Sequence, residues 1–181
     1  KTKKKLLLFD LGGGTVDVTI LTVGKNSYTV ETSKGLPYFG GRNFDEMIVE
    51  AFKLGLQDSH HNIGIESLDE EDHRSLRYLA EKAKKKLNIK KKYRKKIIID
   101  GETIDFALTR DEFDELSTEL VNTCLKVIDS ALLDAELKKE DIDYIVPVGG
   151  GSNMLIIRSS LEKYFEKKMP PPWMPGEAIA R

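Results

Sequence analysis

The segment that most constrains the fold is residues 10–15, with the sequence DLGGGT, which separates two strand-like stretches. A short apolar run, Leu6–Phe9, precedes it, and the alternating Val16, Val18 and Ile20 follow it. This order predicts two antiparallel strands joined by a glycine loop, because a period of two is typical of half-buried strands. The loop is neither a Walker A loop nor a Rossmann fingerprint, since both of those lead into a helix.

The glycine loop carries a specific chemistry. Three consecutive glycines let the backbone approach a ligand closely and turn several N–H groups toward one point. Gly12, Gly13 and Gly14 therefore predict a cradle for phosphate, to which Thr15 adds a hydroxyl. Asp10 can hold Mg²⁺ beside such phosphates through water. The alternative is an ordinary hairpin turn, for which three glycines are entropically costly.

A second glycine run, Gly149, Gly150 and Gly151, lies between a predicted strand and a predicted helix. The N–H groups at a helix N-terminus attract phosphate. Alone, this run is a common strand-to-helix turn. Paired with the first loop, it predicts two glycine loops that hold a nucleotide's phosphates from two sides.

A third candidate is a polar helix face. Glu81, Lys84, Lys85 and Asn88 follow the spacing i, i+3, i+4, i+7 and share one face of a predicted helix. One carboxylate, two ammonium groups and one amide can bind a ribose and a base. From this segment alone, a solvated helix face is the stronger interpretation.

The remaining pattern predicts an α/β or α+β fold in which a middle segment is inserted into an outer one. The Thr109–Glu112 segment has the spacing of a capping box and predicts the start of one long helix. The predicted strands are Leu6–Phe9, Val16–Leu21, Tyr28–Thr32, Ile97–Ile99, Thr103–Leu108 and Tyr144–Val148, and the predicted helices run from Asn43 to Leu56, from Asp69 to Leu87, from Phe113 to Ile128 and from Leu155 to Phe165.

Charge and composition narrow the function classes. The 29 basic and 30 acidic residues nearly cancel, yet residues 82–96 contain ten basic residues and no acidic one. A basic stripe on an acidic body favours a local anion site, and a solvated surface is its plainer interpretation, so we expect no nucleic-acid binding. No apolar run approaches the roughly 20 residues of a membrane helix, so we expect no membrane insertion.

The potential metal ligands and the cysteine suggest no further chemistry. His60, His61 and His73 lack partners at ligand spacing, so a zinc site is not expected. Cys124, the one cysteine, lies on the apolar stripe of its helix and is expected in the core. A single cysteine fits a reducing compartment, so we expect a cytoplasmic protein; the lumen of the endoplasmic reticulum stays open as an alternative.

Taken together, these motifs resemble the seventy-kilodalton heat-shock chaperones. The resemblance begins at residues 9–18 (FDLGGGTVDV) and continues through residues 39–45 (FGGRNFD), 81–87 (EKAKKKL), 106–115, 145–150 (IVPVGG) and 175–180 (PGEAIA). It therefore covers nearly the whole chain, with the motifs in the same order. The family's ATPase domain has the actin-like (ribonuclease H-like) fold, and this chain resembles the second lobe of that domain.

The resemblance implies two subdomains and a set of nucleotide-binding residues. Residues 1–39 and 112–181 would form a base subdomain with the phosphate loops, and residues 40–111 an inserted upper subdomain. Asp10 would hold metal-bound phosphates, with Asp10 and Thr15 as the catalytic residues. The nucleotide would be bordered by Gly12, Gly13, Gly14, Gly41, Gly149, Gly150, Gly151 and Asn153, and its adenosine would face Glu81, Lys84, Lys85 and Asn88.

Several positions depart from the family pattern on the adenosine side. The family usually has an arginine where Lys85 stands and a serine or threonine where Asn88 stands. It also places an arginine, which covers the adenine, where Asn153 stands. The phosphate side keeps the family pattern, so a divergent member with weaker nucleotide binding is expected.

The resemblance further implies ATP or ADP with Mg²⁺ as ligands, and a J-domain co-chaperone and a nucleotide exchange factor as partners. The first lobe and the peptide-binding domain are absent from this sequence, so we expect ATPase activity only in an intact two-lobed domain and none in this chain alone. Two alternatives stay open. One is a non-chaperone member of the actin and sugar-kinase fold, and the other is a degenerate nucleotide-binding co-chaperone.

Overall fold

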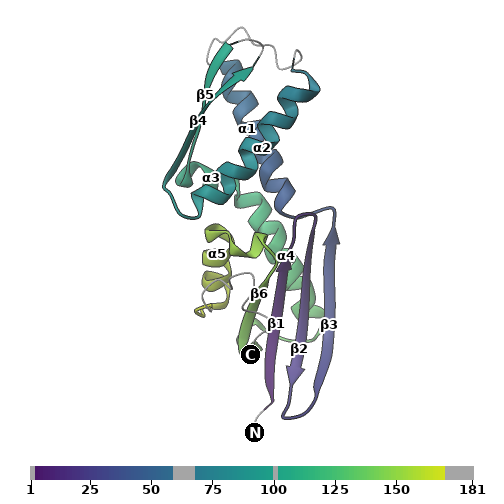
Figure 1. Cartoon of the computed structure of the whole chain (residues 1–181). Coiled ribbons are helices and arrows are strands. Elements are labelled where there is room, and N and C mark those ends of the chain that lie inside the picture. Colours follow the sequence, from purple (N-terminus) through teal and green to yellow (C-terminus); the bar gives the residue numbers. More distant parts are fainter. Residues whose placement is uncertain (1–2, 59–67, 100–101, 170–181) are drawn as a thin grey trace. The chain divides into compact units, whose positions relative to one another are not determined.

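The computed structural model describes residues 3–58, 68–99 and 102–169, which fold as two compact units (Figure 1). Unit 1 comprises Lys1–Gly41 and Val121–Arg181, and unit 2 comprises Arg42–Leu120. Several sequence-based predictions lie outside the described residues: the turn at 100–101, the proline run at 170–172, the motif at 175–180 and the histidines at 60–61.

Unit 1 is built on a four-stranded sheet with the order β3-β2-β1-β6. Strands β1 (Lys4–Leu11), β2 (Thr15–Val23) and β3 (Tyr28–Pro37) form the antiparallel meander that the sequence predicts. Strand β6 (Tyr144–Val148) adds to the other edge of β1 in parallel orientation. The register places Asp10 opposite Asp17 on β2 and opposite Val148 on β6.

One face of this sheet forms the core of unit 1. Alternate residues of β1 and β2 are fully buried there, because successive side chains of a strand point to opposite faces. Helices α4 (Thr118–Asp134) and α5 (Leu155–Phe165) add their own buried side chains to this core. The Thr32 hydroxyl donates to Asp134 at 2.5 Å, and Lys34 lies 2.9 Å from the same carboxylate, which ties α4 to β3. The core residues include Leu7, Phe9, Leu11, Val16, Val18, Ile20, Cys124, Ile128, Ile157 and Leu161.

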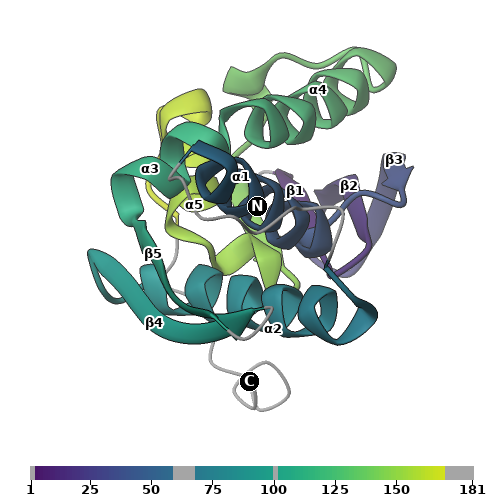
Figure 2. The ribbon, with the colours of Figure 1, turned by 90° about the horizontal axis from the view of Figure 1, so that it is seen from above.

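Unit 2 combines helices with a two-stranded hairpin (Figure 2). Helix α1 (Gly41–Asp58) enters it from unit 1, and α2 (Glu70–Leu87) begins with a capping box between Asp69 and Asp72. Strands β4 (Lys92–Ile99) and β5 (Glu102–Thr109) pair antiparallel with each other. Aromatic contacts join these layers: the rings of Phe52 and Phe106 lie 4.8 Å apart, centroid to centroid.

The prediction of one long helix after residue 109 is wrong. The capping box is confirmed, since Thr109 and Glu112 bond each other reciprocally. However, α3 (Arg110–Leu116) ends at Leu116, and Ser117 separates it from Thr118, the first residue of α4. The Thr118 hydroxyl donates to the carbonyl of Glu115 at 2.8 Å and competes there with the backbone. The apolar stripe runs through this break, so periodicity alone does not reveal it.

Two short 3₁₀ turns complete the described chain. Turn η2 (Lys139–Asp141) leads into β6, and turn η3 (Gly151–Asn153) follows it. The described helices include none long and apolar enough to cross a membrane.

Candidate functional site

The glycine loop between β1 and β2 is a tight turn with an open outer side. The Gly12 amide donates to the Thr15 carbonyl at 3.0 Å, and the Gly12 carbonyl accepts from the Gly41 amide at 2.8 Å. The N–H groups of Gly13 and Gly14 have no hydrogen-bond acceptor among the described residues. A Cβ on either glycine would meet no atom within 4 Å. The loop thus combines two N–H groups that lack a partner among the described residues with open space on the Cβ side of both glycines, and main-chain N–H groups of this kind are what an anion cradle uses.

Gly40 packs closely against the backbone of this loop. A Cβ on Gly40 would lie 2.7 Å from the Gly14 nitrogen and 2.8 Å from the Gly12 carbonyl oxygen. Real Cβ atoms do not approach backbone this closely, so residue 40 must be glycine for the chain to pass this close to the loop. The sequence pattern predicted a role for Gly41 and none for Gly40. The sequence shows two adjacent glycines, Gly40 and Gly41, but only the packing shows that Gly40 is the one at which a side chain would clash.

The second glycine run lies beside the first loop. Strands β1 and β6 are parallel neighbours, so the loops that follow them meet at the same edge of the sheet. Gly149 adopts φ +80°, and a Cβ there would collide with the Asp10 carboxylate and the Leu11 carbonyl. A Cβ on Gly151 would lie 2.7 Å from Leu11 Cγ. The carboxyl ends of adjacent parallel strands are where α/β sheets commonly bind ligands.

The local structure after β6 differs from the expected strand-to-helix turn. The glycines lead into η3, and α5 begins only at Leu155. The Ser152 hydroxyl donates to the Gly149 carbonyl at 2.7 Å and closes the turn, which leaves Asn153 half-exposed. The glycine run therefore leads into the short turn η3 and not directly into the first turn of α5.

Asp10 lies between the two loops, on the sheet face opposite the core. Its register partner Asp17 lies on the same face, because directly opposed residues of paired strands share a face. Burial raises the pKa of Asp10 above its usual range, and the nearby Asp17 carboxylate raises it further. Asp17 is not among the site residues predicted from the sequence. The alternation of β2 indicates the face on which Asp17 lies, but its position opposite Asp10 follows from the register of the two strands.

The polar face of α2 belongs to unit 2, and its four residues differ in environment. Lys84 is nearly buried, and its Nζ lies 2.7 Å from Oδ1 of Asp45 on α1. Glu81 and Lys85 are exposed and pair with each other at 2.5 Å, which lowers the pKa of Glu81. Asn88 is the half-exposed C-cap of the helix. No local sequence pattern indicates Asp45 as the partner of Lys84.

The described residues contain no cluster of metal ligands. Within residues 3–58, 68–99 and 102–169, no group of three or more His, Cys, Asp or Glu side chains could hold a metal ion. Cys124 is buried in the core of unit 1, as predicted, and burial raises the pKa of its thiol to about 12. A thiol of that pKa is a poor nucleophile near neutral pH.

Comparison with known proteins agrees with this geometry. The two glycine loops follow the parallel strands β1 and β6, and Asp10 lies between them. The family model described as "Hsp70 protein" matches residues 1–181, so the chain belongs to the Hsp70 family and has its actin-like ATPase fold. The chain is 34% identical over 182 residues to a ribosome-associated molecular chaperone of Nakaseomyces delphensis. That match covers 98% of this chain and 29% of the relative, so the chain spans less than a third of that protein's length.

Proposed function

We propose that this chain is part of the ATP-binding domain of a molecular chaperone, and that unit 1 binds the phosphates of ATP or ADP. The observation that carries the proposal is the glycine loop after Asp10, in which the N–H groups of Gly13 and Gly14 have no partner among the described residues. The match to the Hsp70 family supports the same assignment.

The residues present fit a magnesium-bound phosphate. Mg²⁺ is usually held by one or two carboxylates, water and substrate phosphates rather than by a cage of protein ligands. Asp10 and Asp17 offer two carboxylates on one sheet face, and after burial, repulsion by Asp17 is the second cause of the raised pKa of Asp10. A cation there would relieve this repulsion, and when bound it would neutralise phosphate charge.

Each residue of the phosphate side has a distinct task in the proposal. Gly13 and Gly14 donate main-chain N–H groups to phosphate oxygens, and Thr15 adds its exposed hydroxyl. Asp10 positions water beside them and accepts its hydrogen bonds. Gly40 and Gly149 keep the backbone close enough for this arrangement, because any side chain there would displace the loop. Gly12, Gly41, Gly150, Gly151 and Asn153 complete the border of the nucleotide.

Glu81, Lys84, Lys85 and Asn88 are proposed to face the adenosine, as the resemblance implies. Within unit 2, the Lys84 ammonium already pairs with Asp45, and Lys85 pairs with Glu81. If Glu81 or Lys85 binds adenosine, the ion pair between these two side chains must be exchanged for contacts with the ribose. These internal pairs favour a second candidate, a family member that binds nucleotide weakly and assists another chaperone without turnover.

In the intact protein, we propose that ATP binding and hydrolysis are coupled to binding and release of unfolded polypeptides. A first lobe would supply the other catalytic groups, and a J-domain co-chaperone and a nucleotide exchange factor would regulate the cycle. We further propose the cytoplasm as its location. The base subdomain would comprise residues 1–39 and 112–181, and the inserted upper subdomain residues 40–111.

Calorimetric titration of the chain with Mg-ADP and with magnesium pyrophosphate tests the proposal. Both ligands are expected to bind, and Gly13→Val is expected to weaken both, because a branched side chain occupies the open space before the N–H groups. The chain alone is expected to hydrolyse no ATP, since hydrolysis requires an oriented water and charge-neutralising groups on both sides of the phosphates. Absence of binding by either ligand would contradict the phosphate site; binding without hydrolysis in the full-length protein would favour the second candidate.

A further inference from the structure

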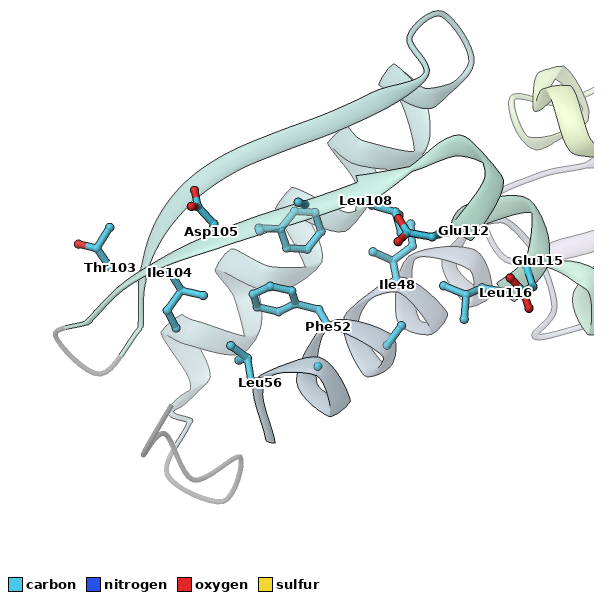
Figure 3. A pocket seen from close by; sticks show the side chains of 14 residues that line it. Ile48, Phe52, Leu56, Thr103, Ile104, Asp105, Leu108, Glu112, Glu115 and Leu116 are labelled. Carbon is cyan, nitrogen blue, oxygen red and sulfur yellow. The ribbon is translucent and has the colours of Figure 1, made fainter. Parts of the chain in front are cut away.

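Unit 2 contains a large apolar pocket that the phosphate site does not use (Figure 3). Its volume is about 800 Å³, which falls within the range typical of ligand sites. One wall is the apolar stripe of α1, at the helical spacing i, i+4, i+8 set by Ile48, Phe52 and Leu56. The opposite wall is β5, and Glu112, Glu115 and Leu116 of α3 close one end.

The pocket follows the outer edge of β5. Six consecutive residues, Thr103–Leu108, line it, although alternate residues of a strand point to opposite faces. In Figure 3, Ile104 lies on the same side of the strand as Phe52, whereas Asp105 lies on the other side. There, Arg94 of β4 lies 2.6 Å from the Asp105 carboxylate. Residues of both faces border one cavity because the cavity runs along the backbone.

This edge carries main-chain groups without partners. Strand β5 pairs with β4 on one side, and among the described residues no other strand pairs with it. In an antiparallel pair, alternate residues direct their N–H and C=O groups away from the partner strand. Between residues 103 and 108, the described chain makes no main-chain hydrogen bond beyond the β4–β5 ladder. An open edge of this kind is a template for a further strand.

We propose that the edge of β5 binds an extended segment of another polypeptide, with apolar side chains at alternate positions and a lysine or arginine near α3. The main chain of that segment would continue the sheet, and its alternate side chains would fill the pocket above Ile48, Phe52 and Leu56. The inference concerns unit 2 alone and does not rest on the nucleotide site.

The acidic residues of the pocket are the reason to expect a basic residue in the bound segment. The fourteen lining residues include three carboxylates, Asp105, Glu112 and Glu115, and no cation. Arg94 neutralises Asp105, which leaves the charge at the α3 end. There, hydrogen bonds from Thr109 keep the pKa of Glu112 below its usual range, and Glu115 is exposed. A basic side chain of the incoming segment would meet both carboxylates.

Gly55 provides a matched pair of variants. It lines the pocket within α1, and a Cβ there would meet no atom within 4 Å. Gly55→Trp therefore fills the groove with an indole, and Gly55→Ala makes the same backbone change without filling it. Thermal unfolding of both variants establishes that the fold is kept.

The test is an amide-resolved NMR titration of the full chain with the blocked peptide acetyl-Lys-Val-Thr-Val-Thr-Val-amide. We expect saturable shifts at alternate amides between residues 103 and 108. Gly55→Trp should weaken binding by about tenfold or more, and Gly55→Ala should leave it nearly unchanged. Glu115→Gln should weaken the lysine peptide by about twofold to fivefold and leave a peptide with glutamine in place of lysine unaffected.

Three results would overturn the proposal. The first is the absence of saturable shifts up to the solubility limit of the peptide. The second is equal binding of a peptide N-methylated at alternate amides, which cannot extend a sheet. The third is slow hydrogen exchange at these alternate amides in the peptide-free chain, which would show that the chain itself covers the edge. A parallel titration with Mg-ADP tests the nucleotide site by itself, so failure of the peptide to bind is distinguished from failure of that site.

Discussion

The Nζ of Lys84 lies 2.7 Å from Oδ1 of Asp45, and both side chains are largely buried, at 11% and 15% exposed. This pair joins the polar face of α2 to α1 inside unit 2. Burial raises the pKa of Asp45 above its usual range, and Lys84 opposes that rise. The ammonium that the sequence suggests for a ligand therefore also compensates a carboxylate within the fold.

Removing one member of this pair should destabilise unit 2. Asp45→Asn is expected to lower the free energy of unfolding by about 1–3 kcal/mol, because it leaves a nearly buried ammonium with a weaker partner. Lys84→Met should have a similar cost. In a double-mutant cycle by urea denaturation, the double variant should lose less stability than the sum of the two single changes. Additive losses would show that the two side chains do not stabilise each other.

The carboxyl of Asp10 should titrate above its usual range, for two separable reasons. Burial is the larger cause and Asp17 the smaller one, so Asp17→Asn is expected to lower the pKa of Asp10 without restoring its usual value. Carbon-detected NMR titration of the Asp10 side chain measures both values. An unchanged pKa in Asp17→Asn would show that the two carboxylates do not interact.

The same shift predicts how stability depends on pH. A carboxyl whose pKa is raised by folding favours the folded state below its unfolded pKa, and this contribution disappears as the pH rises through the folded pKa. Asp10→Asn removes that dependence. The melting temperature of Asp10→Asn relative to wild type should therefore be higher at pH 7 than at pH 3. A difference that is constant across this range would contradict the raised pKa.

Substitutions at Gly13 and Gly40, which lie close together in space, should affect ligand binding and folding stability separately. Gly13→Ala places a methyl group in open space at the mouth of the cradle, so it should leave the melting temperature nearly unchanged and weaken pyrophosphate and ADP alike. Gly40→Ala places a methyl group against the Gly14 nitrogen and should destabilise the chain by about 1–3 kcal/mol, the range of overpacked sites. Differential scanning calorimetry and titration calorimetry distinguish the two. A large loss of stability in Gly13→Ala would show that the loop is more crowded than its geometry indicates.

Asn153 tests the adenosine side of the proposal. If it borders the adenine where the family commonly has an arginine, Asn153→Arg adds a cation over an aromatic face, which stabilises binding by about 0.5–2 kcal/mol. ADP should then bind roughly 2- to 30-fold more tightly, whereas pyrophosphate affinity should not change. Titration calorimetry with both ligands gives the comparison. Equal gains for both ligands would indicate a general effect of positive charge rather than contact with the base.

The sequence by itself determined the elements whose signals are local. The alternation of residues 16–20, the glycines of residues 12–14 and the capping box at Thr109 each specify conformation through neighbouring residues, and the structure confirms a strand, a tight turn and a helix start at these places. The buried position of Cys124 followed from the apolar stripe of its helix in the same way. The order of these motifs was also sufficient to indicate the family.

Only the tertiary structure decided which distant residues meet. The parallel pairing of β1 with β6 brings Gly149 against Asp10, and the docking of Gly40 on Gly14 requires a glycine that the local pattern does not distinguish from Gly41. The partner of Lys84 and the open edge of β5 depend likewise on packing between elements. Sequence periodicity reports which face of an element is buried, but it carries no information on which other element covers that face. That choice is made by side-chain fit and main-chain hydrogen bonding between segments far apart in the chain.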